Sequence, residues 1–437
     1  MLINLLLILL YTGLFAIIIH RNTKGKNSFP GAALYTIAFV TKIVFGCMYG
    51  WFFLHFYGGD DTWYFHTESL KEWQLLKQDP WNFFRKDVFQ SGYKENPLLT
   101  VFNSNDSFFK DLQQNLLIKM LAIFNLLSGG RYYVNVVFYN ALVFWGSYCL
   151  YKTVKKYYPA KTNLWFWLIF FFPPLLFWTS GIRKDGLCFV CLSFCFYQTS
   201  LWISNPGKRK YLAGIIGAWL ALFLLRNFLA LSIVPMLMAW IYSSRYQRQS
   251  LSVYIAVLCM AMLLFFITAY LPASFNLPQK IADRQNAFNR LEGGSALTTY
   301  ELEPGIRSYL GIIPTAADHV FLRPYPAQAF SGPLYILAFA ENLLLLCLLL
   351  YVFLRPSQDW KEQIRQPFTL ALLATALVNY IAIGCMVPFI GAIIRYKVIF
   401  EALLIIVLVQ LSRLQLPFYS RHMVAQRPGN VANTPVP

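Results

Sequence analysis

Apolar runs of about twenty residues recur along this chain of 437 residues and restrict the folds open to it. Residues 2–19, 32–56 and 334–354 are examples, and each is long enough to cross a bilayer. Charged residues make up 13% of the chain, whereas soluble domains carry roughly 25%. The sequence therefore predicts an all-α fold, a polytopic transmembrane helix bundle with about eleven spans in a single domain over residues 1–411. The first run lacks a basic leading region and a cleavage site, so we expect it to be retained.

Six basic clusters alternate with the apolar runs and predict the orientation of the bundle. They occupy residues 20–26, 152–161, 208–210, 245–248, 355–365 and 413–427. Because Lys and Arg collect in cytoplasmic loops, we expect the N-terminus outside and the C-terminus in the cytoplasm. Two long outer loops, about 57–131 and 272–333, then contain short interfacial helices, and residues 412–437 form a basic, partly disordered cytoplasmic tail. The same clusters account for the net charge of +18, so nucleic acid is not an expected partner.

Several basic residues lie at the opposite, outer ends of the apolar runs, where the positive-inside rule does not explain them. They are Arg183, Lys184, Arg226, Arg323, Arg395 and Lys397. Partly buried cations near a membrane surface need anionic partners. Guanidinium groups bind phosphate with two parallel hydrogen bonds and Lys adds a point charge, so this set predicts a site for a lipid-linked phosphate or pyrophosphate. The alternative is ordinary snorkelling or contact with lipid headgroups.

Arg183 and Lys184 follow a Pro-Pro break at Pro173 and Pro174, and they stand between Gly181 and Gly186. We expect this turn to be a loop tip that approaches a ligand closely. A side chain at such a tip should contribute little to packing. The next residue, Asp185, is expected to orient one of the cations or to bind the acceptor.

Two adjacent carboxylates, Asp60 and Asp61, follow a Gly-Gly turn at the outer end of the second apolar run. With Asp185, they are the candidate catalytic residues. Such a pair can bind a divalent cation, position a sugar hydroxyl or act as a general base, and the alternative is a solvated turn at a helix end. No metal ligand is assigned, and a divalent cofactor is left open. The candidate sugar-contacting residues are aromatic or imidazole side chains of the two outer loops: Trp63, Tyr64, His319 and Tyr325.

Four segments, YGGDDTWYF, PPLLFWTSGIRKDGL, FLRPYP with the later Glu341-Asn342 pair, and GAIIRYK, resemble those of bacterial multi-spanning cell-surface glycan proteins. That group includes O-antigen and exopolysaccharide polymerases and C-type glycosyltransferases that use polyprenyl-phosphate sugars. The resemblance covers about residues 50–400. It implies that Asp60 or Asp61 matches the acidic residue that C-type transferases place in their first outer loop. It also implies phosphate-binding roles for four basic residues, Arg183, Lys184, Arg323 and Arg395. One departure is that the acidic residue of C-type transferases follows the first span, whereas here it follows the second.

The expected function is that of a membrane glycosyltransferase or glycan polymerase at the outer face of the bacterial cytoplasmic membrane. Its expected partners are a polyprenyl-phosphate-linked sugar, membrane lipid and a glycan acceptor. The alternative is a transporter or flippase of lipid-linked glycans, which should show charged residues across the midplane and pseudo-symmetric halves. The chain shows few such charges and no such halves. Glu341 and Glu401 do lie within apolar runs, and the spacing of Glu401 from Lys397 predicts an ion pair.

Overall fold

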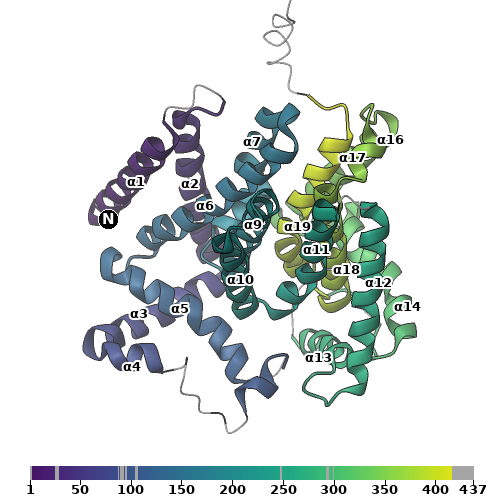
Figure 1. Ribbon diagram of the computed structural model, residues 1–437. Helices are drawn as coiled ribbons and strands as arrows, with labels where there is room; N and C mark the ends of the chain where they lie inside the picture. Colours follow the sequence, from purple (N-terminus) through teal and green to yellow (C-terminus); the bar gives the residue numbers. More distant parts are fainter. Residues whose placement is uncertain are drawn as a thin grey trace, which may run out of the picture.

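The computed structural model describes residues 2–24, 29–86, 88, 93, 96–103, 107–246, 249–291, 295–298 and 300–415. Within these ranges the chain forms helices and no β-strand, apart from two isolated bridges, Ala296 with Phe389 and Pro356 with Ser412. The all-α prediction is therefore confirmed (Figure 1). The predicted disorder of the tail concerns residues that lie outside the described ranges from residue 416 onward.

Ten long helices and one broken pair make up the body of the described structure. The long helices are α1 (Leu2–Thr23), α2 (Ala32–Tyr57), α6 (Tyr132–Tyr157), α9 (Lys184–Ser204), α10 (Arg209–Leu225), α11 (Asn227–Tyr246), α12 (Ser250–Ile267), α16 (Pro333–Leu354), α18 (Pro367–Met386) and α19 (Ile390–Leu411). The broken pair is α7 (Thr162–Phe171) and α8 (Pro173–Ser180). The remaining elements used below are α3 (Asp61–Gln78), α4 (Pro80–Arg85), α5 (Phe108–Ser128), α13 (Leu277–Asn289), α14 (Ile306–Ala317), α15 (Pro326–Ala329), α17 (Trp360–Ile364) and the π-turn η4 (Asp318–Leu322).

Seven of the described helices, α1, α2, α9, α11, α12, α16 and α18, are long and apolar enough to cross a membrane. The broken pair makes an eighth if its two halves count as one span. These helices fit a multi-pass membrane protein, although they are fewer than the eleven spans predicted. The difference lies in α6, α10 and α19. Polar and charged side chains interrupt α6 and α19, and α10 has only 17 residues.

The bend between α7 and α8 follows directly from the sequence. Proline has no backbone N–H and its ring clashes with the preceding turn, so Pro173 ends one helix and starts the next. The two halves meet at 40°. The turn after α8 then packs tightly, because a Cβ on Gly181 would lie 2.3 Å from the ring of Tyr49. A Cβ on Gly186 would lie 2.2 Å from the hydroxyl of Tyr139. Only glycine fits at these two positions of close approach.

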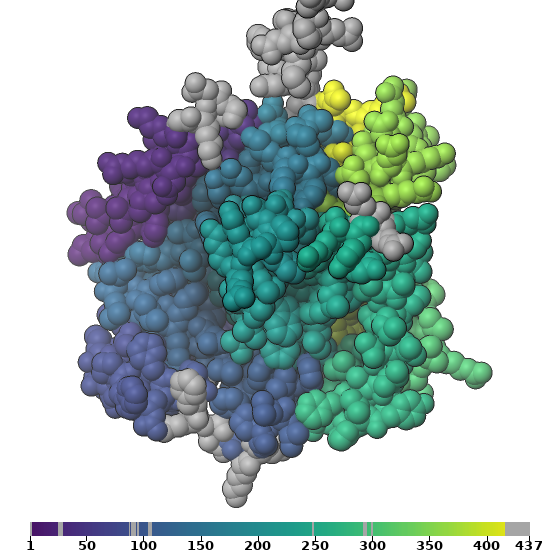
Figure 2. Space-filling view, in the orientation of Figure 1, coloured from purple at the N-terminus to yellow at the C-terminus, as the bar shows by residue number. Residues whose placement is uncertain are grey.

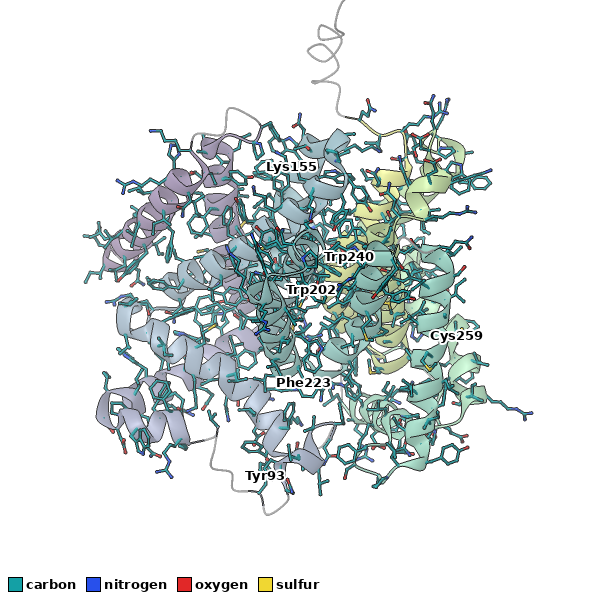
Figure 3. All side chains as sticks on the ribbon, in the orientation of Figure 1. Tyr93, Lys155, Trp202, Phe223, Trp240 and Cys259 are labelled. Atoms are coloured by element: carbon teal, nitrogen blue, oxygen red, sulfur yellow. The ribbon has the colours of Figure 1, made fainter. Side chains whose placement is uncertain are left out.

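The core of the bundle is centred on α19, which is buried without interruption from Lys397 to Leu411. Trp240 of α11 is fully buried near this centre, against the rings of Tyr157, Phe196 and Phe368 (Figure 3). In contrast, α1 lies along the outside of the bundle, and Thr23 is its one buried residue among those described (Figure 1). An apolar helix with so little of its surface covered is typical of a segment that faces lipid.

The described residues of four basic clusters, 20–24, 152–161, 355–365 and 413, lie at one end of the bundle, at the top of Figure 1. Lys155 donates to the carbonyl of Phe29 over 3.3 Å, and Lys161 donates to the carbonyl of Ser412 over 2.6 Å. The backbone N–H of Ser357 donates to the carbonyl of Leu411, the last residue of α19, over 2.7 Å. The described parts of the two long loops lie at the other end, where α3, α4 and α13 form the lower rim (Figures 1 and 2). The charge asymmetry read from the sequence is therefore present in space.

Candidate functional site

Arg183 is the centre of an ion-pair network at the loop end of the bundle. It is the N-cap residue of α9, and only 2% of it is exposed. Its Nη1 lies 2.7 Å from Oδ2 of Asp60 and donates to the hydroxyl of Tyr49 over 2.6 Å, while Nη2 binds Asp61. The expectation of a loop-tip side chain with little packing is therefore wrong. Gly181, two residues earlier, packs against Tyr49, and because of this close contact the turn lies within the bundle.

Two further arginines extend the network across the end of the bundle. Nη1 of Arg395 lies 3.4 Å from Oδ2 of Asp61, and its Nε lies 3.6 Å from Oδ2 of Asp185. Arg226 is paired with the other oxygen of Asp185. The network thus joins the starts of α3, α9 and α19 to the tip between α10 and α11. We call the cluster formed by these residues and their neighbours Lys184, Arg284 and Tyr396 the basic pocket, after its excess of positive side chains.

Local sequence explains how each carboxylate reaches this pocket. Gly58 and Gly59 have φ of +66° and +103°, conformations that favour glycine, and they reverse the chain between α2 and α3. Asp60 is then the N-cap of α3, and Asp61 lies in its first turn. Asp185 lies in the first turn of α9. Negative charge is stabilised at helix N-termini, so the backbone and the arginines both stabilise carboxylates at these positions.

Two cations of the basic pocket form no direct ion pair with a carboxylate among the described residues, although Asp61 and Asp185 lie near Lys184. Lys184 is half-buried next to Arg226 and Tyr396, and Arg284 of α13 lies next to the same two residues. Neither forms an ion pair with any carboxylate in the part of the chain that the structure describes, although Arg284 does lie over the ring of Phe228 at 5.4 Å. Five cations therefore face three carboxylates, and the pocket carries an excess of two positive charges.

The charges of the pocket also affect its titration. Burial alone would raise the pKa of Asp61, but Arg183, Arg395 and Lys184 outweigh it and hold the pKa below its usual value. Burial lowers the pKa of Arg284, Tyr396 partly offsets this effect, and the nearby Arg226 adds to it. A guanidinium whose charged form is disfavoured in this way gains from an anionic ligand. Asp61 is ionised, and with 54% of its side chain exposed it is accessible to a molecule that binds beside such an anionic ligand.

The two aromatic candidates of the first loop have different environments. The Trp63 ring is stacked on Tyr132 with centroids 4.1 Å apart, and its Nε1 donates to the carbonyl of Gly50 over 2.9 Å. Its role here is to pack α3 against α2 and α6. Tyr64 is 52% exposed and contacts the ring of Phe65. Of the two, Tyr64 is the one with a free face for a sugar.

The remaining candidates, Arg323, His319, Tyr325 and Lys397, lie away from the basic pocket, at or beside η4. Arg323 is paired with Asp318 at 3.1 Å, and Tyr325 donates to the same carboxylate over 2.6 Å. His319 is buried and lines a cavity of about 500 Å³ together with both members of that pair.

Lys397 is fully buried and binds Asn342 and, over 3.2 Å, the carbonyl of Val320. The expected ion pair with Glu401 is not formed within 4 Å. Both carboxylate oxygens of Glu401 and of Glu341 lack hydrogen-bond partners among the described residues. Lys397 therefore holds η4 in place and does not reach the basic pocket.

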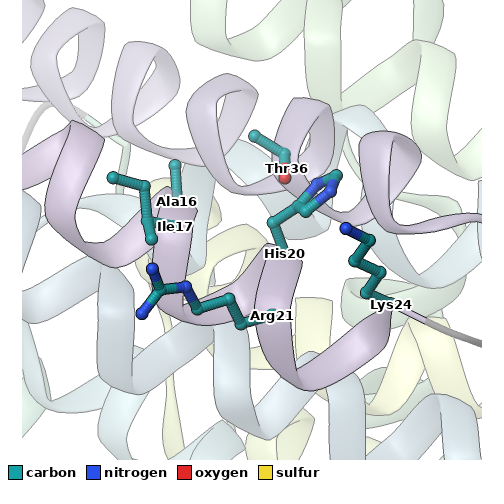
Figure 4. Close-up of a pocket in the computed structure, with 6 residues that line it drawn as sticks. All are labelled: Ala16, Ile17, His20, Arg21, Lys24 and Thr36. Carbon is teal, nitrogen blue, oxygen red and sulfur yellow. The ribbon is translucent and has the colours of Figure 1, made fainter.

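A second hollow, of about 360 Å³, lies at the opposite end of the bundle between α1 and α2. Figure 4 shows the imidazole of His20 between Thr36 of α2 and the side chain of Lys24. Arg21 also lines it. It opens beside the lipid-facing α1 and carries no carboxylate among its described lining residues, so it resembles a headgroup contact.

Sequence reasoning missed three residues of the basic pocket: Arg284, Tyr49 and Tyr396. Arg284 was open to the same argument as the other outer cations, since it lies in the second outer loop. The two tyrosines carry no signal of their own among the many aromatics of the chain. The described residues contain no group of three or more His, Cys, Asp or Glu side chains placed to hold a metal ion. Comparison of the chain with protein-family models, curated proteins and solved structures found no match.

Proposed function

We propose that this protein is an integral membrane glycosyltransferase or glycan polymerase. It transfers sugar from a polyprenyl-phosphate or polyprenyl-pyrophosphate donor to a glycan acceptor at the outer face of the bacterial cytoplasmic membrane. The observation that supports this most is the excess of two positive charges in the basic pocket, with Lys184 and Arg284 unpaired among the described residues. Partly buried cations of this kind are costly without an anion.

The chemistry assigned to the pocket follows from its two kinds of charge. The donor phosphate binds Lys184 and Arg284, and its oxygens gain further contacts from Arg226 and Arg395. As the bond between the anomeric carbon and the phosphate oxygen breaks, the electron pair leaves with the phosphate, and these cations stabilise the negative charge. The acceptor hydroxyl oxygen attacks the anomeric carbon and gives its proton to Asp61. Asp60 and Asp185 hold the arginines in position.

The proposal includes eleven spans with the N-terminus outside and the C-terminus in the cytoplasm. Helices α6, α10 and α19 have 26, 17 and 22 residues, so each reaches the roughly 17 residues needed to cross the hydrocarbon core. Their polar side chains face other helices, as the buried Asn135 and Asn140 of α6 illustrate. The basic clusters at the opposite end from both loops support this orientation.

Glycan analysis of a deletion strain tests the function. A strain without the gene should display either single-unit surface chains, which indicate a polymerase, or chains that lack one sugar, which indicate a transferase. Plasmids encoding the wild type or the exposed-residue control Arg21→Ala should restore the parental glycan, whereas Lys184→Ala and Asp61→Asn should not. Complete lipid-linked units retained on the cytoplasmic side would instead indicate a flippase. A parental glycan in the deletion strain would overturn the proposal.

A further inference from the structure

The cavity beside η4 differs from the basic pocket in charge and construction. It is an open hollow of about 500 Å³, within the range of roughly 300–1,000 Å³ that is common for small-molecule sites. Its wall is rich in hydroxyl, carboxylate and imidazole groups, contributed by Thr298, Tyr300, Thr315, Asp318, His319 and Arg323. Several polar groups that converge on one cavity are typical of a binding site and not of a packing defect.

The wall of this cavity is fixed by the interior of the bundle. Lys397 of α19 donates to the carbonyl of Val320, and Asn342 of α16 donates to the carbonyl of Arg323 over 2.6 Å. These bonds hold the middle and the C-terminal end of the π-turn, an element that is frequent at functional sites. Two buried polar side chains within apolar helices thus serve to position this turn.

The charges of the cavity balance, in contrast to those of the basic pocket. Asp318 and Arg323 pair at 3.1 Å, and the hydroxyl of Tyr325 also binds the carboxylate. His319 is 2% exposed, and its Nδ1 has no hydrogen-bond partner among the described residues. Burial lowers the pKa of His319, so its imidazole is neutral at pH 7. A ligand for this cavity is therefore uncharged overall and supplies hydroxyl groups to the balanced ion pair and to the imidazole that lines the cavity.

The start of α19 connects the cavity to the basic pocket, although no residue of α19 lines the cavity. The backbone N–H of Leu297 donates to the carbonyl of Pro388 over 2.7 Å, and Ile390 donates to the carbonyl of Ser295 over 3.1 Å. These bonds join the loop that carries Thr298 to the start of α19, the helix that also carries Arg395. A molecule in the cavity would therefore be connected, through the start of α19, to the place assigned to the donor phosphate.

We propose that the cavity beside η4 is a saccharide-binding subsite, separate from the basic pocket, that holds neutral sugar units of the acceptor glycan. The assignment as an acceptor subsite rests on the proposed function, whereas the binding of a neutral saccharide does not. Asp318 and Arg323 bind adjacent hydroxyls, and His319 and Thr315 bind a third. In this arrangement the donor and the acceptor bind at separate sites near the start of α19.

Binding of oligosaccharides released from the surface glycan of producing cells tests the subsite. The probe is titrated into purified wild-type protein by calorimetry, and a polyprenyl phosphate analogue is titrated separately. The variants are Thr315→Val, which removes only a hydroxyl, and His319→Gln, which retains polar atoms. Thr36→Val, at a half-buried threonine of the opposite end, is the matched control. One lost hydrogen bond should weaken saccharide binding roughly threefold to tenfold.

The expected result is weaker saccharide binding in Thr315→Val and His319→Gln, unchanged binding in Thr36→Val, and equal binding of the polyprenyl phosphate by all four proteins. Equal saccharide affinity in all four, or no binding to the wild type with the analogue present, would overturn the subsite and leave the donor site intact. Saccharide binding that depends on these residues while the analogue fails to bind would leave the subsite intact and overturn the proposed function.

Discussion

Replacement of Arg183 by alanine should destabilise the protein by about 3 kcal/mol, because it leaves buried polar groups without a partner. Breaking a buried ion pair costs roughly 3–5 kcal/mol. Arg183 is 2% exposed, but the Asp60 and Asp61 side chains are 24% and 54% exposed and regain water, so the lower end of that range applies. The unsatisfied hydroxyl of Tyr49 is included in this figure. About 3 kcal/mol corresponds to roughly a 150-fold change in the ratio of folded to unfolded protein.

A double-mutant cycle isolates the ion pair from other effects of the substitution. In the Arg183→Ala background, Asp60→Asn removes the charge that the first change left uncompensated. The double variant should therefore lose at least 1 kcal/mol less than the two single variants together. Arg183→Lys keeps the charge but not the planar fork, so its stability should be intermediate.

Unfolding of the purified proteins in micelles, followed by tryptophan fluorescence, measures these differences. Arg21→Ala controls for the loss of an exposed arginine at the other end of the bundle. A stability of Arg183→Ala within 0.5 kcal/mol of the wild type, or strict additivity in the cycle, would refute the reasoning, since 0.5 kcal/mol is about the scatter of independent sites.

Asp61→Asn should reduce glycan transfer by roughly 10²–10⁴-fold while the protein still accumulates in the membrane, and near-normal output would reduce Asp61 to a helix-end residue. Burial lowers the pKa of His66 to about 4, below the 6.5 of the unfolded chain, so stability present above pH 6.5 is lost as the pH falls toward 4. The loss should reach about 3 kcal/mol, and pH-dependent unfolding of His66→Gln should lack it. A membrane-impermeant maleimide should label Ser295→Cys but not Ser357→Cys in intact cells; the reverse pattern would invert the topology.

The sequence allowed much of the basic pocket to be predicted because charge at an outer tip is a local signal. Arg183, Arg226 and Arg395 each stand at the outer end of an apolar run, and the structure brings them together. Their pairing with carboxylates could not be predicted, since Arg183 and Asp61 are 122 residues apart. That contact depends on how α2 and α8 pack, which no local pattern encodes.

Spacing along a helix was a poorer guide to partners within the bundle. Glu401 is one turn from Lys397, which predicted an ion pair, but Lys397 instead binds Asn342 and the carbonyl of Val320. Lys397 is also only two residues from Arg395, yet these side chains reach different sites. On a helix, positions two apart point in different directions, so a shared segment did not mean a shared ligand. Length and hydrophobicity alone likewise do not identify α6, α10 and α19 as spans.

Affinity for a polyprenyl phosphate analogue is the measurement that tests the central claim, a phosphate held by the unpaired cations of the basic pocket. A hydrogen bond to a charged group contributes roughly 1.5–3 kcal/mol, so Lys184→Ala and Arg284→Ala should each bind about 10-fold to 150-fold more weakly than the wild type. Arg209→Ala, at an exposed arginine that starts α10 at the opposite end from Arg226, should bind as the wild type does. Equal affinity in Lys184→Ala, Arg284→Ala and the wild type would contradict the account.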